Sequence, residues 1–143
     1  MKMGEDRLTE FGKIKVSEIM VHDPIYTHPD EKISTTELLM LRKNIGGLPV
    51  VHDGKSKQVI GIITQRDIRL ARFAMALDSP YTIVQDLMTP EPFTVNENDT
   101  IKDVLEVMFF NQIERVPVVN ESKELIGLVL EKDILKKLLE LLS

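Results

Sequence analysis

The 143-residue sequence contains no cysteine. This absence excludes a disulfide framework and any zinc site built on cysteine, and it is compatible with a reducing compartment. No apolar run approaches the roughly 20 residues that a membrane-spanning helix needs. The polar start MKMGEDRLTE has no apolar signal-peptide core. We therefore expect a cytoplasmic protein that makes no use of a membrane.

Aromatic and basic residues are also few. The chain has five Phe, two Tyr and no Trp, and its 18 Lys and Arg are outnumbered by 23 Asp and Glu, which gives a formal net charge of -5. Binding to nucleic acid depends on clustered cations, and single-strand binding adds interleaved aromatic side chains. The composition therefore disfavours a nucleic-acid partner, while 43% apolar and 29% charged residues predict an ordinary folded domain.

Recognisable catalytic and metal-binding motifs are missing as well. His22, His28 and His52 stand at unrelated spacings in turn-rich stretches, which does not predict a metal site. The sequence has no G-x-S-x-G, H-E-x-x-H or Walker-type loop, and no recognisable scaffold pairs its carboxylates as acid and base. We expect neither an enzyme nor a metalloprotein.

The chain contains an internal duplication. At a shift of 68 residues VSEIMVHDPI, which starts at Val16, aligns with VQDLMTPEPF, which starts at Val84, and GLPVV (47–51) aligns with RVPVV (115–119). After the next turn the shift becomes 66, and VIGIITQRDI aligns with LIGLVLEKDI. Two copies are too few for a solenoid and indicate one unit packed on the other by a pseudo-twofold axis. We expect the functional site in the cleft between them.

Each repeat reads as strand, helix, strand, strand, helix, which predicts an α/β (α+β) fold made of two β-α-β-β-α units packed sheet to sheet. The strands LPVV and VIGIIT in the first copy correspond to VPVV and LIGLVL in the second, and polar turns separate them. Spacings of three, four and seven predict one buried helix face in each copy. Its expected residues are Ile33, Met40 and Leu41 in the first copy, and Ile101, Val104, Leu105 and Met108 in the second.

These patterns divide the chain into four parts: an N-terminal extension at 1–13, the first repeat at 14–78, a linker at 79–83, and the second repeat with an amphipathic helix at 84–143. The break at Asp78, Ser79 and Pro80 marks the linker. The last helix carries a wide apolar stripe, for which we favour docking on its own domain and keep a dimer or partner contact as the alternative. The stripe consists of Ile134, Leu135, Leu138, Leu139, Leu141 and Leu142.

The strand-to-helix corner GIITQRD (61–67) is a candidate anion and sugar site. Gly61 allows close backbone approach, and Thr64 and Asp67 lie beside the free N-H groups of a helix start, which attract anions. The Asp67 carboxylate can accept hydrogen bonds from the two vicinal hydroxyls of a ribose, while Thr64 and Arg66 face a phosphate. A helix cap made by Thr64 and Asp67 is the alternative explanation.

The second corner, GLVLEKD (127–133), keeps the aspartate as Asp133 but has Leu130, which cannot cap, in place of the threonine. Lys132 adds a cation to this corner, and Arg115 stands just before the second PV strand. We therefore expect two unequal sites, of which one binds nucleotide well and the other weakly, or which prefer different numbers of phosphates. We favour Asp67 as the principal ligand and Asp133 as the weaker one.

The PV strands and paired G-h-h-T-x-x-D corners, in two units of about 60 residues, resemble a tandem pair of CBS domains, the cystathionine-β-synthase-type repeats called a Bateman module. The resemblance covers residues 14 to 138. It implies two pseudo-symmetric clefts that hold AMP, ADP, ATP or S-adenosylmethionine, with Asp on the ribose and Ser or Thr on the phosphate, and pairs that form a dimeric disc. In some family members an arginine before the PV strand binds the phosphate; the second copy has Arg115 there, beside Lys132, and the first has only Gly46 and Gly47. It also implies adenine contacts around Asp30 and Glu31 and around 98–100, where Thr100 also fits a helix cap. An apolar slot for the base would be lined by Ile62, Val50, Val118 and Leu128.

We accordingly expect a stand-alone regulatory module that needs no cofactor, binds an adenosine-containing ligand between its repeats, and forms a homodimer or contacts a regulated protein partner. The alternative is a ligand-free scaffold whose paired repeats mediate homodimerisation or partner association.

Overall fold

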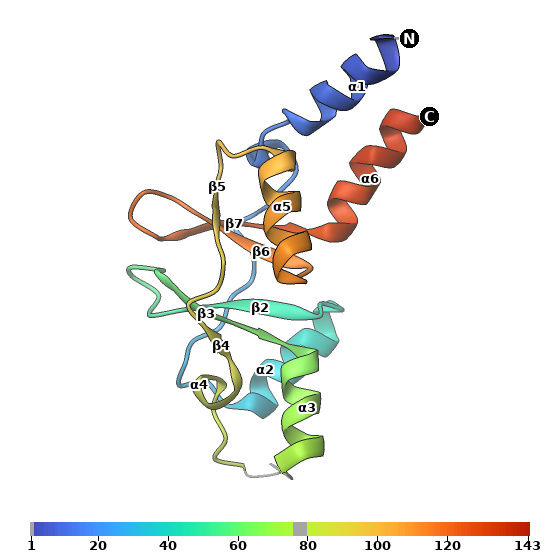
Figure 1. Ribbon diagram of the computed structural model, residues 1–143. Helices are drawn as coiled ribbons and strands as arrows, with labels where there is room; N and C mark the ends of the chain where they lie inside the picture. The colour runs from blue at the N-terminus through green and yellow to red at the C-terminus, as the bar shows by residue number, and fades with distance from the viewer. Residues whose placement is uncertain (1, 76–79) are drawn as a thin grey trace. The chain divides into compact units, whose positions relative to one another are not determined.

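The computed structural model describes residues 2–75 and 80–143, and the expected break at Asp78 and Ser79 lies outside them. The chain divides into two compact units (Figure 1). Unit 1 comprises residues 1–24 and 93–143, and unit 2 comprises residues 25–92. The described residues form six α-helices and two sheets, which confirms the mixed α/β fold class.

Unit 1 is built on a four-stranded sheet in the order β1-β7-β6-β5. Strand β5 runs parallel to β6, and the other neighbours are antiparallel. Its elements are α1 (Lys2–Gly12), a 3-10 turn (Val16–Glu18), β1 (Val21–His22), β5 (Val95–Asn96), α5 (Ile101–Asn111), β6 (Arg115–Val119), β7 (Leu125–Leu130) and α6 (Glu131–Leu142).

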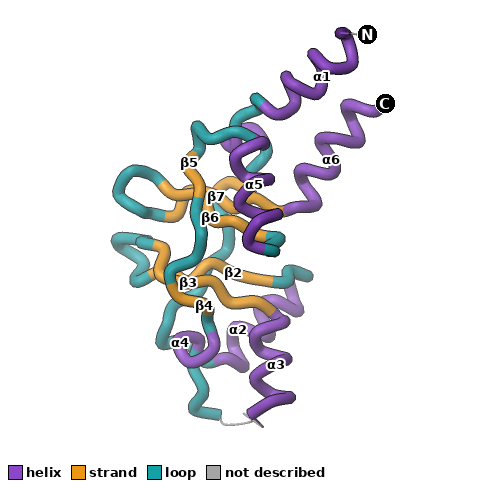
Figure 2. The backbone as a smooth tube through the Cα atoms, in the orientation of Figure 1, coloured by secondary structure: helices purple, strands orange, loops and turns teal. Residues whose placement is uncertain are grey.

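Unit 2 repeats this plan with an antiparallel sheet in the order β2-β3-β4 (Figure 2). A parallel bridge from Thr27 to Val50 takes the place that the pairing of Val95 with Val118 has in unit 1. Its elements are α2 (Ile33–Lys43), β2 (Gly47–Val51), β3 (Val59–Thr64), α3 (Gln65–Met75), α4 (Val84–Leu87) and β4 (Thr89–Pro90).

The leading segments of the two repeats are exchanged between the units. Strand β1, from the first repeat, pairs with β7, and β4, from the second repeat, pairs with β3. Methionines on these segments explain the corner glycines. A Cβ on Gly61 would lie 2.5 Å from Met88 Sδ, and a Cβ on Gly127 would collide with Met20 in the same way. The close approach predicted at Gly61 is thus made by a segment of the other repeat.

Each unit has its own core, and the two differ in polarity. In unit 2 the buried hydroxyls of Thr27 and Thr36 lie 3.3 Å apart and hydrogen-bond. The corresponding residues of unit 1 are Val95 and Val104, both buried. Both cores are otherwise aliphatic. They centre on Val16, Ile101, Val116, Val129 and Ile134 in unit 1, and on Met40, Leu48, Ile63, Ile68 and Val84 in unit 2.

The buried helix faces are narrower than predicted. Ile33 and Met40 are buried, but Leu41 is 73% exposed and Leu105 is 39% exposed, so the prediction was wrong for these two leucines. Successive helical residues point about 100° apart, because an α-helix has 3.6 residues per turn. Leu41 therefore turns away from the face that its neighbour Met40 occupies.

The apolar stripe of α6 is only half explained by docking on its own unit. Ile134 is buried in the core of unit 1, whereas Leu135, Leu139 and Leu142 are 56%, 64% and 74% exposed. Among the described residues, no helix is long and apolar enough to span a bilayer.

Candidate functional site

The first corner joins β3 to α3 through a reciprocal pair of hydrogen bonds. The Asp67 N-H donates to Thr64 Oγ1 at 3.1 Å, and the Thr64 N-H donates to Asp67 Oδ2 at 3.0 Å. This is a capping box, so the predicted alternative role of these residues is realised. The Asp67 side chain makes no other hydrogen bond or ion pair within the described residues, so its Oδ1 remains an acceptor. Both residues are half-buried.

A capping box by itself does not identify a ligand site, because another helix start has one too. Thr100 and Asp103 form the same box at the start of α5, where Thr100 caps the helix as expected. The geometry of the first corner alone therefore leaves the prediction for Asp67 untested.

The second corner joins β7 to α6 without this box. Leu130 makes no side-chain cap, and the half-buried Asp133 carboxylate has no hydrogen bond or ion pair among the described residues. Arg115 pairs with Leu130 across the sheet, which puts it at the same corner as Lys132 and Asp133. Arg115 is half-buried and Lys132 is exposed. The backbone register thus brings the three residues to one corner, and their use as ligands stays a prediction.

The two corners make the same backbone hydrogen bond but carry different side chains. Gln65 N-H donates to Gly46 O at 2.9 Å, and Glu131 N-H donates to Glu114 O at 3.0 Å, so both helices begin in the same way. The first corner has the hydroxyl of Thr64 and the exposed cation of Arg66. The second has no hydroxyl but two cations, and each corner combines a carboxylate with positive charge.

The four residues predicted to line a base slot lie next to the corner glycines. Val50 pairs with Gly61 and Val118 with Gly127, while the next pairs along the strands contain Ile62 and Leu128. Val50 and Val118 are 0% exposed and belong to the cores of their units. Leu128 is also buried, and Ile62 is half-buried. Their first role is therefore packing, and base contact remains a prediction.

Among the described residues, one titratable group has a clear pKa shift, and it lies in the turn between β2 and β3. The N-H groups of Ser56 and Lys55 each donate to Asp53 Oδ1 at 2.8 Å. These bonds, that of Ser56 first, lower the pKa of the Asp53 carboxyl below its ordinary value of 3.8. Asn120 Oδ1 accepts from Ser122 and Glu124 in the corresponding turn of unit 1. This carboxylate therefore organises a turn.

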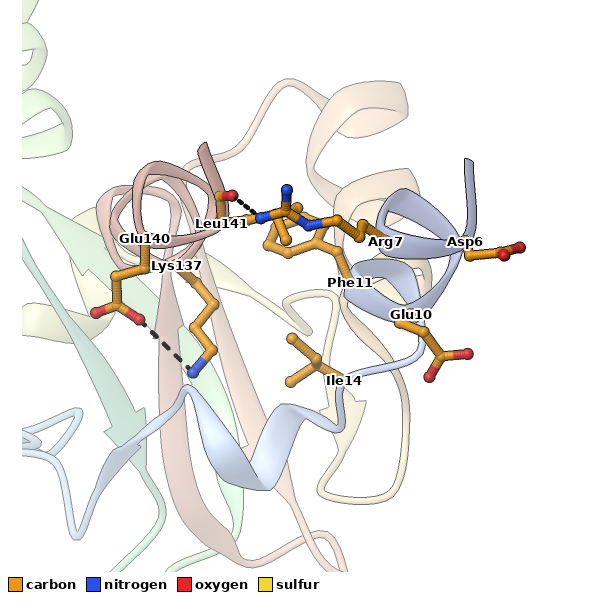
Figure 3. Close-up of a pocket in the computed structure, with 8 residues that line it drawn as sticks. All are labelled: Asp6, Arg7, Glu10, Phe11, Ile14, Lys137, Glu140 and Leu141. Carbon is orange, nitrogen blue, oxygen red and sulfur yellow. Dashed lines mark hydrogen bonds and ion pairs between the residues drawn. The ribbon is translucent and has the colours of Figure 1, made fainter. Parts of the chain in front are cut away.

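A hollow of about 630 Å³ lies between α1 and α6 in unit 1, where the sequence predicted only an extension (Figure 3). Phe11, Ile14 and Leu141 give it an apolar lining. Lys137 is paired with Glu140 at 3.7 Å, and the Arg7 guanidinium donates to the Leu141 carbonyl. Figure 3 shows the Asp6 and Glu10 carboxylates pointing away from the hollow. Both cations of the lining are thus engaged by groups of α6, and the carboxylates point away, so the hollow does not resemble a nucleotide site.

Within residues 2–75 and 80–143 no group of three His, Asp or Glu side chains could hold a metal ion. Two carboxylates near the segments where the resemblance implies adenine contacts accept hydrogen bonds from backbone N-H groups of the protein. Glu31 Oε1 accepts from the Lys32 N-H at 3.1 Å, and Asp99 Oδ2 accepts from the Asn96 N-H at 2.8 Å.

The comparison with curated proteins finds inosine-5'-monophosphate dehydrogenases. The chain is 34% identical over 123 residues to that of Methanocaldococcus jannaschii, which covers 86% of this chain and 23% of the relative. It thus spans about a quarter of the length of the curated relatives that it matches.

Among solved structures, the crystal structure of CBSX2 of Arabidopsis thaliana in complex with AMP is similar, with a TM-score of 0.80 and 22% identity. The match covers 91% of this chain and 99% of that one, and at this identity it shows the fold. The CBS domain pair of protein MJ0100, solved with 5'-methylthioadenosine and S-adenosyl-L-methionine, has a TM-score of 0.78 and 27% identity over 88% of this chain and 96% of that one.

The family model for the CBS domain matches twice, at residues 16–73 and 84–140. Its two matches coincide with the duplication, with the paired strand-to-helix corners and with the architecture of the similar structures. The chain therefore belongs to the CBS domain family, of which it carries a tandem pair.

Proposed function

We propose that the protein is a regulatory module that binds an adenosine-containing ligand at its strand-to-helix corners. The ligand class is an adenine nucleotide (AMP, ADP or ATP) or S-adenosylmethionine. The likeness to the MJ0100 domain pair supports this class, because that protein was solved with two adenosine compounds.

The observation that carries the proposal is the second aspartate. Asp67 has a structural role as a capping residue, but Asp133 occupies the same place with no capping partner. A half-buried carboxylate that lacks a hydrogen bond loses solvation without compensation. Because both corners have a carboxylate and only one of them uses it for capping, we infer a second role that the two share. Accepting hydrogen bonds from the hydroxyls of a ribose is such a role.

The first corner remains the principal site in this proposal. Asp67 takes the ribose, and Thr64 and Arg66 take the phosphate. Asp133, Arg115 and Lys132 form a second site of different preference, with Ile62, Leu128, Val50 and Val118 beside the base. Regulation then means that the ligand binds one conformational state more tightly than another.

A thermal-shift screen with AMP, ADP, ATP, adenosine and S-adenosylmethionine tests the proposal. A ligand at 100 times its dissociation constant stabilises the folded state by about 2.7 kcal/mol, which raises the melting temperature by several degrees. At least one of these compounds should give that shift. The absence of a shift with all five at millimolar concentration would refute the ligand class.

A ligand-free scaffold is the second candidate function. The exposed Phe73, Phe109 and Phe110 favour it, because large exposed apolar side chains mark association surfaces. Homodimerisation and contact with a protein partner both remain proposals. The expectation that the chain is not an enzyme also stays a prediction, since the dehydrogenases match it over about a quarter of their length.

A further inference from the structure

Methionine is the one sulfur-bearing residue type of this chain, which has seven methionines and no cysteine. Hydroperoxides oxidise a methionine thioether to a sulfoxide, which turns an apolar side chain into a polar one. Met20, Met40 and Met108 are buried, with exposures of 8%, 0% and 5%, whereas Met88 is half-buried. Among the methionines whose side chains the structure describes, Met88 is therefore the most accessible to an oxidant.

Met88 lies between α4 and β4 and packs on the central strand of the unit 2 sheet. A Cβ on Gly61 would lie 2.5 Å from Met88 Sδ, and the Met88 side chain also packs against the core of unit 2. The sheet order β2-β3-β4 makes β3 the central strand and β4 an edge strand. Met88 thus holds this edge strand against β3, the strand that leads into the first corner.

The backbone of β4 gives this strand little stability of its own. It has two residues, both exposed, and one of them is Pro90, which has no N-H to donate. Beyond the strand, the Glu91 N-H donates to the Ile60 carbonyl oxygen at 3.1 Å. A segment with few backbone hydrogen bonds and exposed residues opens locally at a low free energy. The position of β4 therefore depends on the packing of Met88, and each opening admits solvent to the sulfur.

The corresponding methionine of unit 1 is better protected. Met20 aligns with Met88 at the shift of 68 residues and packs on Gly127 as Met88 packs on Gly61. Met20 belongs to the buried core of unit 1, and the strand that follows it, β1, contains no proline. The two repeats thus place the same side chain on the same glycine with different exposure, so Met20 is an internal comparison for Met88.

An oxygen atom on the Met88 sulfur would lack a hydrogen-bond donor in the folded unit. The core against which Met88 packs has aliphatic side chains, among them Leu48, Val50 and Ile63. The Thr89 carbonyl oxygen, 3.1 Å from the Gly61 Cβ position, is an acceptor and cannot pair with a sulfoxide oxygen. A sulfoxide at this position loses hydration without compensation, which destabilises the packing of β4 on β3.

We propose that Met88 is an oxidation site through which hydroperoxides loosen the first corner. The Met88 sulfur forms an S-O bond as the O-O bond of the hydroperoxide breaks, and the proton of the transferred oxygen passes to the leaving oxygen. The thioether is thereby oxidised by two electrons, and the hydroperoxide is reduced to an alcohol, or to water in the case of hydrogen peroxide.

The sulfoxide then weakens the pairing of β4 with Gly61 and Ile62, the first two residues of the first corner. Its effect on ligand binding rests on the proposed function. The oxidation of Met88 and the resulting loss of stability do not depend on any ligand.

Treatment of the full chain with hydrogen peroxide, without ligand, tests the site. Tandem mass spectrometry of proteolytic fragments assigns each added oxygen to one methionine, and Met88 should gain oxygen before Met20, Met40 and Met108. The melting temperature should fall by about 4 °C or more as the Met88 sulfoxide accumulates. Incubation with the two epimer-specific methionine sulfoxide reductases should restore it.

The key variant is Met88→Leu, which keeps an apolar side chain of similar volume but cannot be oxidised. Its matched control is Met20→Leu, at the corresponding position of unit 1. Melts before treatment establish that both variants fold. After treatment Met88→Leu should keep its melting temperature, and Met20→Leu should lose as much as the wild type. An adenosine compound that binds the untreated protein should bind the oxidised wild type more weakly, and oxidised Met88→Leu unchanged.

The possible failures are distinguishable. Oxygen uptake by Met88 no earlier than by the three buried methionines would refute the site. An unchanged melting temperature with Met88 fully oxidised, or an equal loss in Met88→Leu, would overturn its structural effect. Ligand binding that survives Met88 oxidation would refute the link to the first corner. If no adenosine compound binds the untreated protein, the proposed function fails alone, because the oxidation and melting results decide the role of Met88 by themselves.

Discussion

Unit 1 and unit 2 share one plan but place their polar groups differently. Unit 2 has a buried pair of threonine hydroxyls, a Thr-Asp capping box at the start of α3, and an ion pair between Glu37 of α2 and Arg72 of α3. At the corresponding positions unit 1 has two buried valines, the N-cap residue Leu130, which makes no side-chain cap, and the leucines Leu105 and Leu138. The duplicated backbone therefore does not require any of these polar contacts, and each one is a feature of a single copy that substitution can test.

The largest expected effect comes from the cores. Val95→Thr puts a hydroxyl into the aliphatic core of unit 1 without a partner, which should lower the free energy of unfolding by about 2 to 3 kcal/mol. Val95→Thr with Val104→Thr recreates the pair of unit 2 and should recover part of this loss. The converse double change, Thr27→Val with Thr36→Val, should be nearly neutral. Urea unfolding measures all three, and a double change in unit 1 no better than the single one would refute the paired-hydroxyl account.

The corner glycines should give the next largest effect. Gly61→Ala should destabilise by about 2 kcal/mol, because the new methyl group meets Met88 and the Thr89 carbonyl oxygen, the latter at 3.1 Å. For Gly127→Ala the three nearest atoms all belong to the flexible side chain of Met20, so about 1 kcal/mol is expected. Chemical denaturation compares the two variants. Equal stability of both variants and the wild type would show that the methionines move aside freely.

The two aspartates should differ in stability when each is replaced by alanine. Asp67→Ala removes half of a capping box and should cost about 1 to 2 kcal/mol, whereas Asp133→Ala should cost under about 0.5 kcal/mol because Asp133 caps nothing. Thermal melts without ligand measure the difference. A larger loss from Asp133→Ala would mean that its carboxylate has a structural role that its contacts do not show.

The smallest effect concerns the turns. The Asp53 carboxyl has a lowered pKa in the folded state, so its contribution to stability is present above its ordinary value of 3.8 and is lost as the pH falls through and below it. Asp53→Asn should retain the turn, as Asn120 does in unit 1, and should flatten the pH dependence of the melting temperature there. Melts from pH 6 to about pH 2 test this, and an unchanged acid profile would contradict it.

Most of the fold could be predicted from the sequence because each strand and helix of the repeated unit occurs twice and can be checked against its counterpart. The helix at 101–111 and the corner at 61–67 were recognisable from periodicity and capping residues alone. The exchange of β1 and β4 could not be predicted in this way. Alignment shows that two segments are alike, but strand partners depend on contacts distant in sequence. The same limit hid the hollow at α1, a helix without a repeated counterpart to compare.

For the candidate site, the sequence identified the residues at each corner, and their use as ligands stays a prediction. Spacing identified the Thr64–Asp67 pair and its possible capping role, and strand pairing brought Arg115 to the corner of Asp133. Exposure was harder to predict, since Leu41 and Leu105 satisfied the apolar period yet face outward. A residue at the edge of an apolar stripe is buried only if another element covers it.

The most direct test of the central claim is calorimetric titration of the adenosine compound that gives the largest thermal shift, into the wild type, Asp67→Asn and Asp133→Asn. Asparagine keeps an oxygen for the Thr64 N-H, so the cap survives while the charge is lost. Binding should weaken about 10-fold or more in Asp67→Asn, as loss of charge-assisted hydrogen bonds implies, and less in Asp133→Asn. Unchanged affinity in both variants would contradict the assignment of the corners as the ligand site.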